Sequence, residues 1–167
     1  MRNIFKEFDK DDKGVISKKD FQEQIKSLYG DVISEEITNK ANIIKDYVNL
    51  NDKVYLIYQN IGGGIDYHVL RYSISPIVTN LMYEWSLGPK YNDNDIWSYD
   101  ITKEEFVQKL INENFDYVFI AKIDKQFIDI YGDLIEGNYN ENNFQDLENK
   151  LLKINPKDNT VTLSLVK

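Results

Sequence analysis

Two apolar runs constrain the fold of this chain more than any other feature of its sequence. Val54 to Tyr58 reads VYLIY, and Asp116 to Ile123 reads DYVFIAKI. Both runs are rich in β-branched and aromatic residues, and in neither do apolar residues alternate regularly with polar ones. A strand of this kind has both faces buried, as the interior strands of a parallel sheet do. Both runs are therefore predicted to lie inside a sheet.

Helical segments are predicted before and after the first of these strands. The segment from Ser34 to Val48 has its apolar residues on one helical face, with Ser34 as the N-cap. Positions 65–76 are predicted as a helix that Pro76 ends, although their apolar residues also alternate well enough for a strand. A short second strand is predicted from Ile77 to Met82.

Capping signals mark two further helices. Thr102 is predicted as an N-cap with Glu105 as its capping-box partner, in a helix that continues to about Asn112. Asp124 is predicted to cap a short helix that runs through Tyr131. After a polar connector, two short strands are expected to form an antiparallel hairpin at the C-terminus.

This alternation of helices and buried strands predicts an α/β fold. We expect a mostly parallel, three-layer, Rossmann-like sheet to which the C-terminal hairpin adds an antiparallel edge. Residues 31–167 are expected to form this α/β domain. Residues 1–30 are expected to form an N-terminal helical segment with an EF-hand-like turn.

The EF-hand-like turn lies in the stretch EFDKDDKGVISKKDF, from Glu7 to Phe21. Asp9 and Asp20 fall into the register of a calcium loop, but Lys13 stands where a ligand belongs and Asp20 replaces the bidentate glutamate. An alternative without metal is a turn followed by a helix that Ser17 caps. We predict no metal site here, with weak calcium binding as the alternative.

Charge and composition argue against several classes of function. The net charge of -8 would repel a phosphate backbone, so nucleic acid is not an expected partner. The chain has no cysteine, which excludes disulfides and cysteine metal sites, and His68 is its only histidine. A catalytic triad or a histidine-based metal site cannot be assembled from these residues. We therefore expect no catalytic residue, metal or cofactor in this chain alone.

The candidate ligand site follows the first buried strand. Open α/β sheets bind ligands at the carboxyl ends of their strands. Glycines there let the backbone approach a ligand and expose amide groups to an oxyanion, whereas a flexible turn is the alternative. Asp124 follows the second buried strand and is expected at the same edge. The candidate residues after the first strand are Gln59, Asn60, Gly62, Gly63 and Gly64.

Two further features are predicted to cover this edge. Arg71 could bind a carboxylate or a phosphate, or could pair instead with Asp66 or Glu84. The loop from Tyr83 to Asp100 interleaves aromatic residues, Trp85 among them, with amides and acids. Such a mixture suits a carbohydrate surface, although a loop of this kind also packs on itself. We expect the glycine-rich turn and this aromatic loop to share one pocket.

The order of several motifs resembles that of a known family. The motifs are VYLIYQNIGGGIDYHVLRYSISP, WSLG, FDYVFIAKIDKQFIDIYGDLI, LLKI and TLSLV. They resemble the soluble C-terminal region of bacterial multi-spanning membrane proteins that are similar to family C, mannosyltransferase-type glycosyltransferases of cell-surface polysaccharide assembly. The resemblance covers about Ile33 to Val166, and Arg71, Tyr72 and Trp85 match its RY and WSLG signatures.

This resemblance implies a function without catalysis in the chain itself. In such proteins catalysis is expected in the membrane-embedded part and its first extracytoplasmic loop, so the resemblance implies an accessory domain at the extracytoplasmic face. Its expected partner is a carbohydrate or a lipid-linked sugar. Contact with the membrane is expected only through a transmembrane part outside this chain, because no apolar run approaches the roughly 18 residues that a spanning helix needs.

Two alternatives from other classes stay open. The first is a small soluble enzyme that acts on a sugar nucleotide or a phosphorylated metabolite, through the Gly62 to Gly64 turn and Arg71. The second is a calcium-binding interaction domain built on Asp9 to Asp20.

Overall fold

A computed structural model of the chain describes residues 18–58, 65–80, 89–91, 97–99 and 102–167. Five strands form one sheet in the order β2-β1-β5-β6-β7. Strands β2, β1 and β5 run parallel to one another, whereas β6 is antiparallel to both of its neighbours, β5 and β7. The strands are β1 (Lys53–Tyr58), β2 (Val78–Thr79), β5 (Tyr117–Lys122), β6 (Lys150–Lys157) and β7 (Thr160–Leu165).

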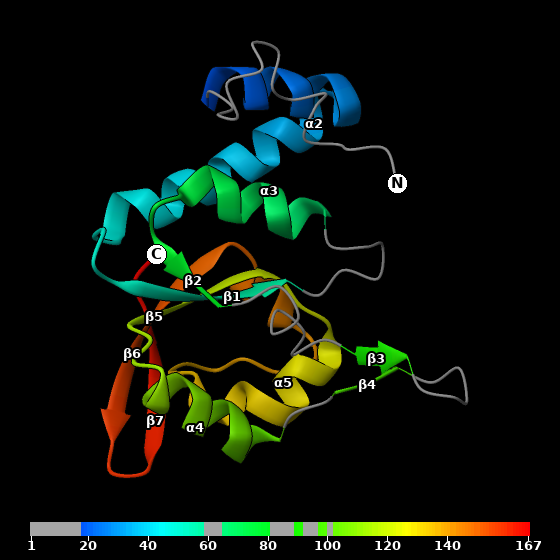
Figure 1. Cartoon of the computed structure of the whole chain (residues 1–167). Helices are drawn as coiled ribbons and strands as arrows, with labels where there is room; N and C mark the ends of the chain where they lie inside the picture. The colour runs from blue at the N-terminus through cyan, green and yellow to red at the C-terminus, as the bar shows by residue number, and fades with distance from the viewer. Residues whose placement is uncertain (1–17, 59–64, 81–88, 92–96, 100–101) are drawn as a thin grey trace.

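Helices cover both faces of this sheet (Figure 1). Helices α2 (Lys18–Tyr47) and α3 (Ile65–Ile74) lie on one face, and α4 (Lys103–Asn112) and α5 (Lys125–Tyr131) lie on the other. Two apolar clusters fill the spaces between helices and sheet. Successive residues of β1 alternate between these clusters, since Tyr55 and Ile57 face α4 and α5, while Val54 and Leu56 face α2 and α3. The chain is therefore a mixed α/β fold.

Both doubly apolar runs form interior strands, as predicted. Residues Val54 to Tyr58 of β1 are all buried, and so are Val118 to Ala121 of β5. The two strands pair in parallel from Val54 opposite Tyr117 to Ile57 opposite Ile120. The prediction that both strands lie inside the sheet with their carboxyl ends at one edge is confirmed, and the structure adds that they are direct neighbours.

The prediction of a mostly parallel sheet is wrong, and the Rossmann-like arrangement is not confirmed. A parallel strand after β5 would need a helix that carries the chain back along the whole strand. Helix α5 has seven residues and rises about 10 Å, roughly half the length of a six-residue strand. The 3-10 turns Gly132–Leu134 and Phe144–Leu147 follow it, and β6 then begins beside the end of β5, with Lys150 opposite Ile120. Strand β6 therefore runs antiparallel to β5.

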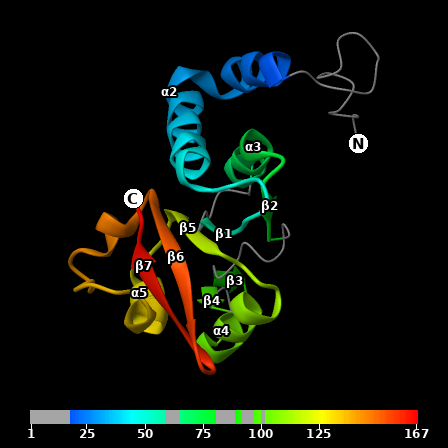
Figure 2. The ribbon, with the colours of Figure 1, turned by 90° about the vertical axis from the view of Figure 1, so that its left-hand side faces the viewer.

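Helix α2 is longer than predicted and bends along its length (Figure 2). It runs from Lys18 to Tyr47 without a break, so the prediction that Ser34 caps its start is wrong. The residues before Ser34 include no proline, and the helix continues through Gly30, a residue type at which many helices end. The helix also passes through residues 30 and 31, between which the sequence places the start of the α/β domain.

The other helices agree with their capping signals. At the start of α4, the Thr102 hydroxyl accepts from the Glu105 backbone N–H and the Glu105 carboxylate accepts from the Thr102 N–H, which completes the predicted capping box. Asp124 caps α5 by accepting from the Phe127 N–H at 3.2 Å. Helix α3 ends at Ile74, before Pro76, which decides between helix and strand in favour of the helix.

A second, two-stranded sheet lies within the long aromatic loop. Its strands are β3 (Pro89–Tyr91) and β4 (Trp97–Tyr99), which pair antiparallel. The sequence predicts only a loop over these residues. Three-residue strands carry too few residues to show an alternating pattern.

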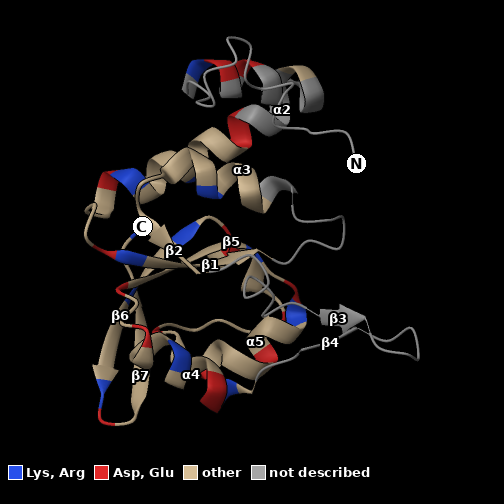
Figure 3. Cartoon of the chain, viewed as in Figure 1, with Lys and Arg blue, Asp and Glu red and all other residues tan. Residues whose placement is uncertain are grey.

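Charged residues lie mainly on the helices and connections, while the strands are largely uncharged (Figure 3). Of the helices in the described part of the chain, none is both long and apolar enough to cross a membrane. Helix α2 is long, but charged residues are spread along it.

The capping box of α4 gives a direct test of this local structure. Replacing Thr102 with Ala leaves the Glu105 N–H without its acceptor and should lower the free energy of unfolding by about 1 kcal/mol. Thr102→Ser keeps the hydroxyl and should lose less than half of that amount. Urea denaturation of the three proteins measures both effects, and equal losses in the two variants would contradict the capping role.

Candidate functional site

The topology of the parallel strands marks one edge of the sheet as a crevice. Strand β1 leads to α3 on one face, and its parallel neighbour β5 leads to α5 on the opposite face. Open α/β sheets bind ligands where adjacent strands send their connections to opposite faces, outside the carboxyl ends of the strands. The candidate site is therefore the edge at which β1 and β5 end, here called the β1–β5 edge.

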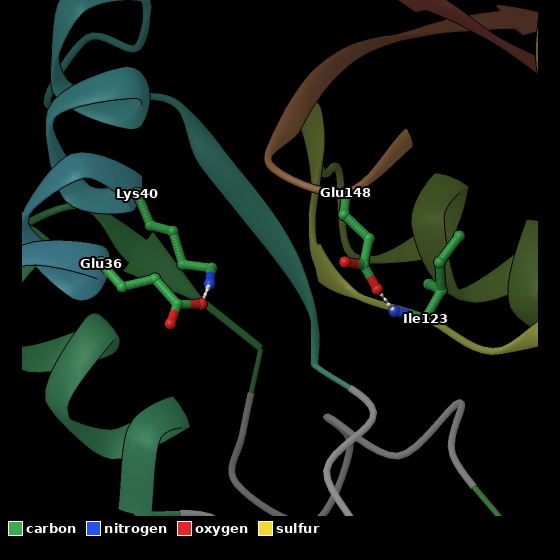
Figure 4. Close-up of polar contacts among 4 residues, drawn as sticks. All are labelled: Glu36, Lys40, Ile123 and Glu148. Atoms are coloured by element: carbon green, nitrogen blue, oxygen red, sulfur yellow. Dashed lines mark hydrogen bonds and ion pairs between the residues drawn. The ribbon is translucent and has the colours of Figure 1, made fainter. Parts of the chain in front are cut away.

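On the side of α2, a buried cation lies beside the end of β1. The Lys40 side chain is only 4% exposed, and its Nζ lies 5.8 Å from the centre of the Tyr58 ring. Its Nζ also donates to the carboxylate of Glu36, one helical turn earlier, and that carboxylate is half exposed. A buried ammonium needs such partners, because removing a charge from water is costly. Figure 4 shows this pair on one side of the β1 ribbon, near the strand's end.

On the side of α5, two acidic residues from the connector after α5 bind the end of β5 and the start of α5. The Glu148 carboxylate accepts from the Ile123 N–H at 3.3 Å, on the opposite side of the β1 ribbon from the Lys40 pair (Figure 4). The Glu141 carboxylate pairs with Lys125, the first residue of α5. This hydrogen-bonded pair lowers the pKa of the Glu141 carboxyl and raises the pKa of the Lys125 ammonium.

At the end of β2, a side chain takes over the role of a strand backbone. The Asn80 side-chain oxygen accepts from the Leu56 N–H at 2.8 Å, and its amide nitrogen donates to the Leu56 carbonyl at 3.2 Å. The Tyr67 hydroxyl then donates to the Asn80 carbonyl at 2.8 Å. Asn80 thus continues the β1–β2 ladder by one residue after the two-residue strand stops, which ties α3, β1 and β2 together.

Thr79 is the unusual polar residue of this region. Its hydroxyl is buried and has no hydrogen-bond partner within the part of the chain that the structure describes. Thr79 stands opposite Val54 in the parallel ladder and so shares the face of the sheet that α2 and α3 cover. A buried hydroxyl without a partner costs free energy, and such groups deserve a functional explanation.

The β3–β4 hairpin lies past the carboxyl ends of β1 and β5, toward the face that carries α4 and α5 (Figures 1 and 2). Its register pairs Tyr91 with Trp97 and Pro89 with Tyr99. Directly opposed residues share a face of a ribbon, as do residues two apart on one strand. The backbone therefore assigns these four positions, three of them aromatic, to a single face of the hairpin.

The structure places the predicted site residues unequally. Asp124 lies at the β1–β5 edge, where it was expected, and its carboxylate caps α5. Arg71 lies in the last turn of α3, which leads to the start of β2 opposite Lys53, at the amino end of β1. Arg71 is therefore not brought to Asp124. The residues that lie outside the described part of the chain are Gln59, Asn60, Gly62, Gly63, Gly64 and Trp85.

Part of the predicted pocket between the glycine-rich turn and the aromatic loop lies within the described residues. The described part of the loop, the β3–β4 hairpin, lies at the expected edge (Figure 1). The turn itself is outside the described residues, so their proximity stays a prediction. The same holds for the EF-hand-like stretch, of which only residues 18–21 are described, as helix. Both alternatives for that stretch place a helix there.

Sequence reasoning missed Lys40, Thr79 and Asn80. Lys40 falls on the apolar face of its helix, among Ile37, Ala41 and Ile44. Helical periodicity alone could therefore have predicted that this lysine is buried. Asn80 carries no such signal, because an asparagine after a short strand ordinarily reads as a turn residue. Its role depends on the position of Leu56, which is distant in sequence.

Hydrogen-bond acceptors and aromatic residues both occur at this edge. Carboxylates can accept hydrogen bonds from hydroxyls, and the hairpin contains three aromatic residues. Within the described residues there is no group of three or more histidines, cysteines or acids that could hold a metal ion.

Comparisons with protein-family models, with curated protein sequences and with solved structures find no match to this chain. The case for a function therefore depends on the geometry of the β1–β5 edge and on the resemblance of the motifs.

The unpartnered hydroxyl of Thr79 gives a test of the ligand-free site. Thr79→Val keeps the shape of the side chain and removes the unpaired hydroxyl, so it should raise the free energy of unfolding by about 1 kcal/mol. Thr162→Val, on the partly exposed hairpin, serves as the control and should change stability by less than about 0.5 kcal/mol. A loss of stability in Thr79→Val, measured by urea denaturation, would show that the hydroxyl is bonded after all.

The Glu141–Lys125 pair gives a prediction about pH. Because the pKa of Glu141 is lowered in the folded state, the pair stabilises the fold above the ordinary glutamate pKa, and this contribution is lost as the pH falls through the lowered value. Lys125→Met should return the pKa of Glu141 toward its ordinary value. Lys153→Met, at an exposed position of β6, should leave the pKa of Glu141 unchanged. Carbon-detected NMR titration of the carboxyl measures this. An unchanged pKa in Lys125→Met would contradict the pairing.

Proposed function

We propose that this chain is a glycan-binding accessory domain without catalytic activity of its own, which belongs to an extracytoplasmic membrane protein of cell-surface glycan assembly. Its ligand is a carbohydrate or a lipid-linked sugar, and its binding site is the β1–β5 edge. The single observation that carries the proposal is the aromatic hairpin at the crevice of the sheet.

The hairpin supplies the apolar half of a sugar site. Its register assigns Tyr91, Trp97 and Tyr99 to one face, and it lies past the ends of β1 and β5. Sugar rings have apolar faces that stack on flat aromatic side chains. Three aromatic residues on six strand positions are a dense supply for this purpose.

The edge supplies the polar half of the site. Glu36, Asp124 and Glu148 bring carboxylates to the ends of β1 and β5, and the buried Lys40 ammonium holds the Glu36 carboxylate there. Carboxylates beside an aromatic surface suit a ligand rich in hydroxyl groups. The resemblance of the motifs to family C glycosyltransferase proteins supports a glycan as the class of ligand.

Calorimetric titration of the full chain with α-linked mannotetraose tests this function. We expect binding that Trp97→Ala weakens at least about five-fold, because each stacked ring contributes about 1 kcal/mol or more. Tyr139→Ala, at a partly buried tyrosine of the connector after α5, is the matched aromatic control and should leave the affinity within about two-fold. No heat with mannotetraose, or equal losses in both variants, would count against the proposal.

The second candidate, an enzyme that acts on a sugar nucleotide, is favoured by the topology alone. The point where β1 and β5 send their connections to opposite faces is where many α/β enzymes bind nucleotides. Titration with GDP-mannose distinguishes the candidates. Binding of GDP-mannose together with silence toward mannotetraose would replace the accessory-domain proposal with the enzyme.

A further inference from the structure

The hairpin of β6 and β7 has one face that the α/β core does not use. Successive residues of a strand alternate between the two faces of a sheet, and Leu152, Ile154 and Leu163 enter the apolar cluster under α4 and α5. The residues that alternate with them lie on the opposite face, on which α2 and α3 cover the neighbouring strands. We call six of these residues the hairpin face: Lys153, Asn155 and Lys157 of β6, and Thr160, Thr162 and Ser164 of β7.

Helices α2 and α3 leave the hairpin face uncovered. Lys153, Lys157 and Thr160 are exposed, and the other three residues of the face are partly exposed. The apolar cluster beneath α2 and α3 takes in Leu151, at the start of β6, but none of the six. Figures 1 and 2 both show β6 and β7 extending away from α2 and α3. The hairpin face is therefore open to a ligand.

The register of the strands makes the hairpin face one continuous surface. Directly opposed residues on one face of an antiparallel pair have their Cβ atoms about 5 Å apart. Tyr117 of β5, which is partly exposed, stands opposite Lys153 and extends the surface toward α2. The cross-strand pairs of the face are Lys153 with Ser164, Asn155 with Thr162, and Lys157 with Thr160.

The middle of the hairpin face carries neutral hydrogen-bonding groups. The Asn155 side-chain nitrogen donates to the Ser164 hydroxyl at 2.8 Å and to the Lys153 carbonyl at 3.5 Å. These contacts fix the amide on the surface, beside the hydroxyl of Thr162. Amides and hydroxyls both donate and accept hydrogen bonds, as a ligand rich in hydroxyl groups requires.

Two lysines give the hairpin face a positive charge, although the chain has a net charge of -8. The face contains no acidic residue, and the ammonium groups of Lys153 and Lys157 form no hydrogen bond or ion pair within the described residues. The acids nearest in the chain and in the ladder are Asp158, in the hairpin turn, and Asp116, whose carboxylate accepts from the Lys53 N–H. Both lysines of the face thus remain available to an anion.

We infer that the hairpin face binds an acidic carbohydrate chain, whose hydroxyls meet the amide and hydroxyl groups of the face and whose anionic groups meet the two lysines. The carbohydrate class rests on the proposed function. The negative charge of the ligand and the place of binding follow from the hairpin itself.

The spacing of the lysines favours a chain of sugars over a single sugar. Lys153 and Lys157 are four residues apart on one strand, which separates their Cα atoms by about 13 Å. A chain with several anionic groups meets both lysines at once, and contact at two points strengthens the binding of the whole. A second copy of this protein is a poor occupant, because two hairpin faces would bring their lysines together.

The hairpin face is separate from the β1–β5 edge. Lys153 stands opposite Tyr117, the first residue of β5, and the rest of the hairpin continues past that end of the strand. The β1–β5 edge lies at the other end, where β5 stops. Variants at one site should therefore leave binding at the other site unchanged.

NMR titration of the full chain with tetragalacturonate tests the inference. Exposed ion pairs are weak, so we expect a dissociation constant of about 0.1–1 mM at low salt, with shifts of the β6 and β7 amides. Raising the salt from about 20 to about 200 mM should weaken binding at least about three-fold, because salt screens exposed charges. Galacturonate itself, which has one carboxylate, should bind at least about ten-fold more weakly.

Charge reversal at the two lysines tests the place of binding. Lys153→Glu and Lys157→Glu should each weaken the binding of tetragalacturonate at least about three-fold, because each replaces an attraction with a repulsion. Lys19→Glu makes the same change of charge at an exposed position of α2 and should alter the constant less than about 1.5-fold. Each variant should keep the dispersed amide spectrum of the original chain, which shows that it is folded.

Three results would overturn the inference. Amides of β6 and β7 that stay unshifted up to about 10 mM tetragalacturonate would show that the face binds no acidic sugar chain. Binding that both charge reversals leave unchanged would place the ligand elsewhere. Tetraglutamate that binds the face more tightly than tetragalacturonate would assign it to an acidic segment of a protein.

The same samples separate this inference from the proposed function. Trp97→Ala should leave the binding of tetragalacturonate within about two-fold, and Lys153→Glu should leave the binding of mannotetraose within about two-fold. Binding of mannotetraose alone would overturn the inference and keep the site at the β1–β5 edge. Binding of tetragalacturonate alone, through the two lysines, would keep the inference and overturn the glycan site at that edge.

Discussion

The parallel pairing of β1 with β5 is the interaction on which the rest of this structure depends. These two strands are buried on both faces, and each contributes side chains to both apolar clusters. Asp116 anchors their amino ends, because its carboxylate accepts from the Lys53 N–H at 2.8 Å and its own N–H donates to the Lys53 carbonyl at 3.0 Å. Strands so deeply buried can tolerate few unpaired backbone groups, which explains why the remaining strands and side chains are arranged to complete the ladder.

The side chain of Asn80 completes this hydrogen-bond ladder where strand β2 has ended. Strand β2 has only two residues, so it leaves the middle of β1 without a backbone neighbour on that side. The amide of Asn80 has one acceptor and a donor group, as a peptide has, and it meets both backbone groups of Leu56. Among the described residues, no strand pairs with this side of β1 beyond Asn80.

The two faces of the sheet differ in whether a charged residue is buried against them. On the α4 and α5 face, the buried residues are apolar, and the ion pair of Lys103 with Asp133 lies outside them. On the α2 and α3 face, Lys40 enters the buried region with Glu36 as its ionic partner. Burying the Lys40 ammonium costs desolvation free energy, which offsets much of its attraction to the half-exposed Glu36 carboxylate. The pair fixes that carboxylate beside the end of β1, which is where the proposed site lies.

The sequence by itself determined the elements whose causes are local. Two runs that are apolar on both faces were sufficient to predict interior strands, because a strand with one face in water would carry polar residues at alternate positions. Thr102 with Glu105, and Asp124, predicted their helix starts, because a cap forms between residues three positions apart. The mixed α/β class follows from the order of these elements.

Only the tertiary structure decided the features that depend on distant residues. The sheet is less parallel than predicted because β6 pairs antiparallel with both β5 and β7, and where β6 begins depends on how far α5 carries the chain. Asn80 acquires its role from Leu56, and Lys40 from Tyr58, and neither partner is near in sequence. Arg71 was assigned to the site because it follows the glycine-rich turn, but a helix that runs back along the sheet carries its last turn away from that edge. The β1–β5 edge is assembled from separate parts of the chain. Closeness in sequence therefore does not show which residues meet there.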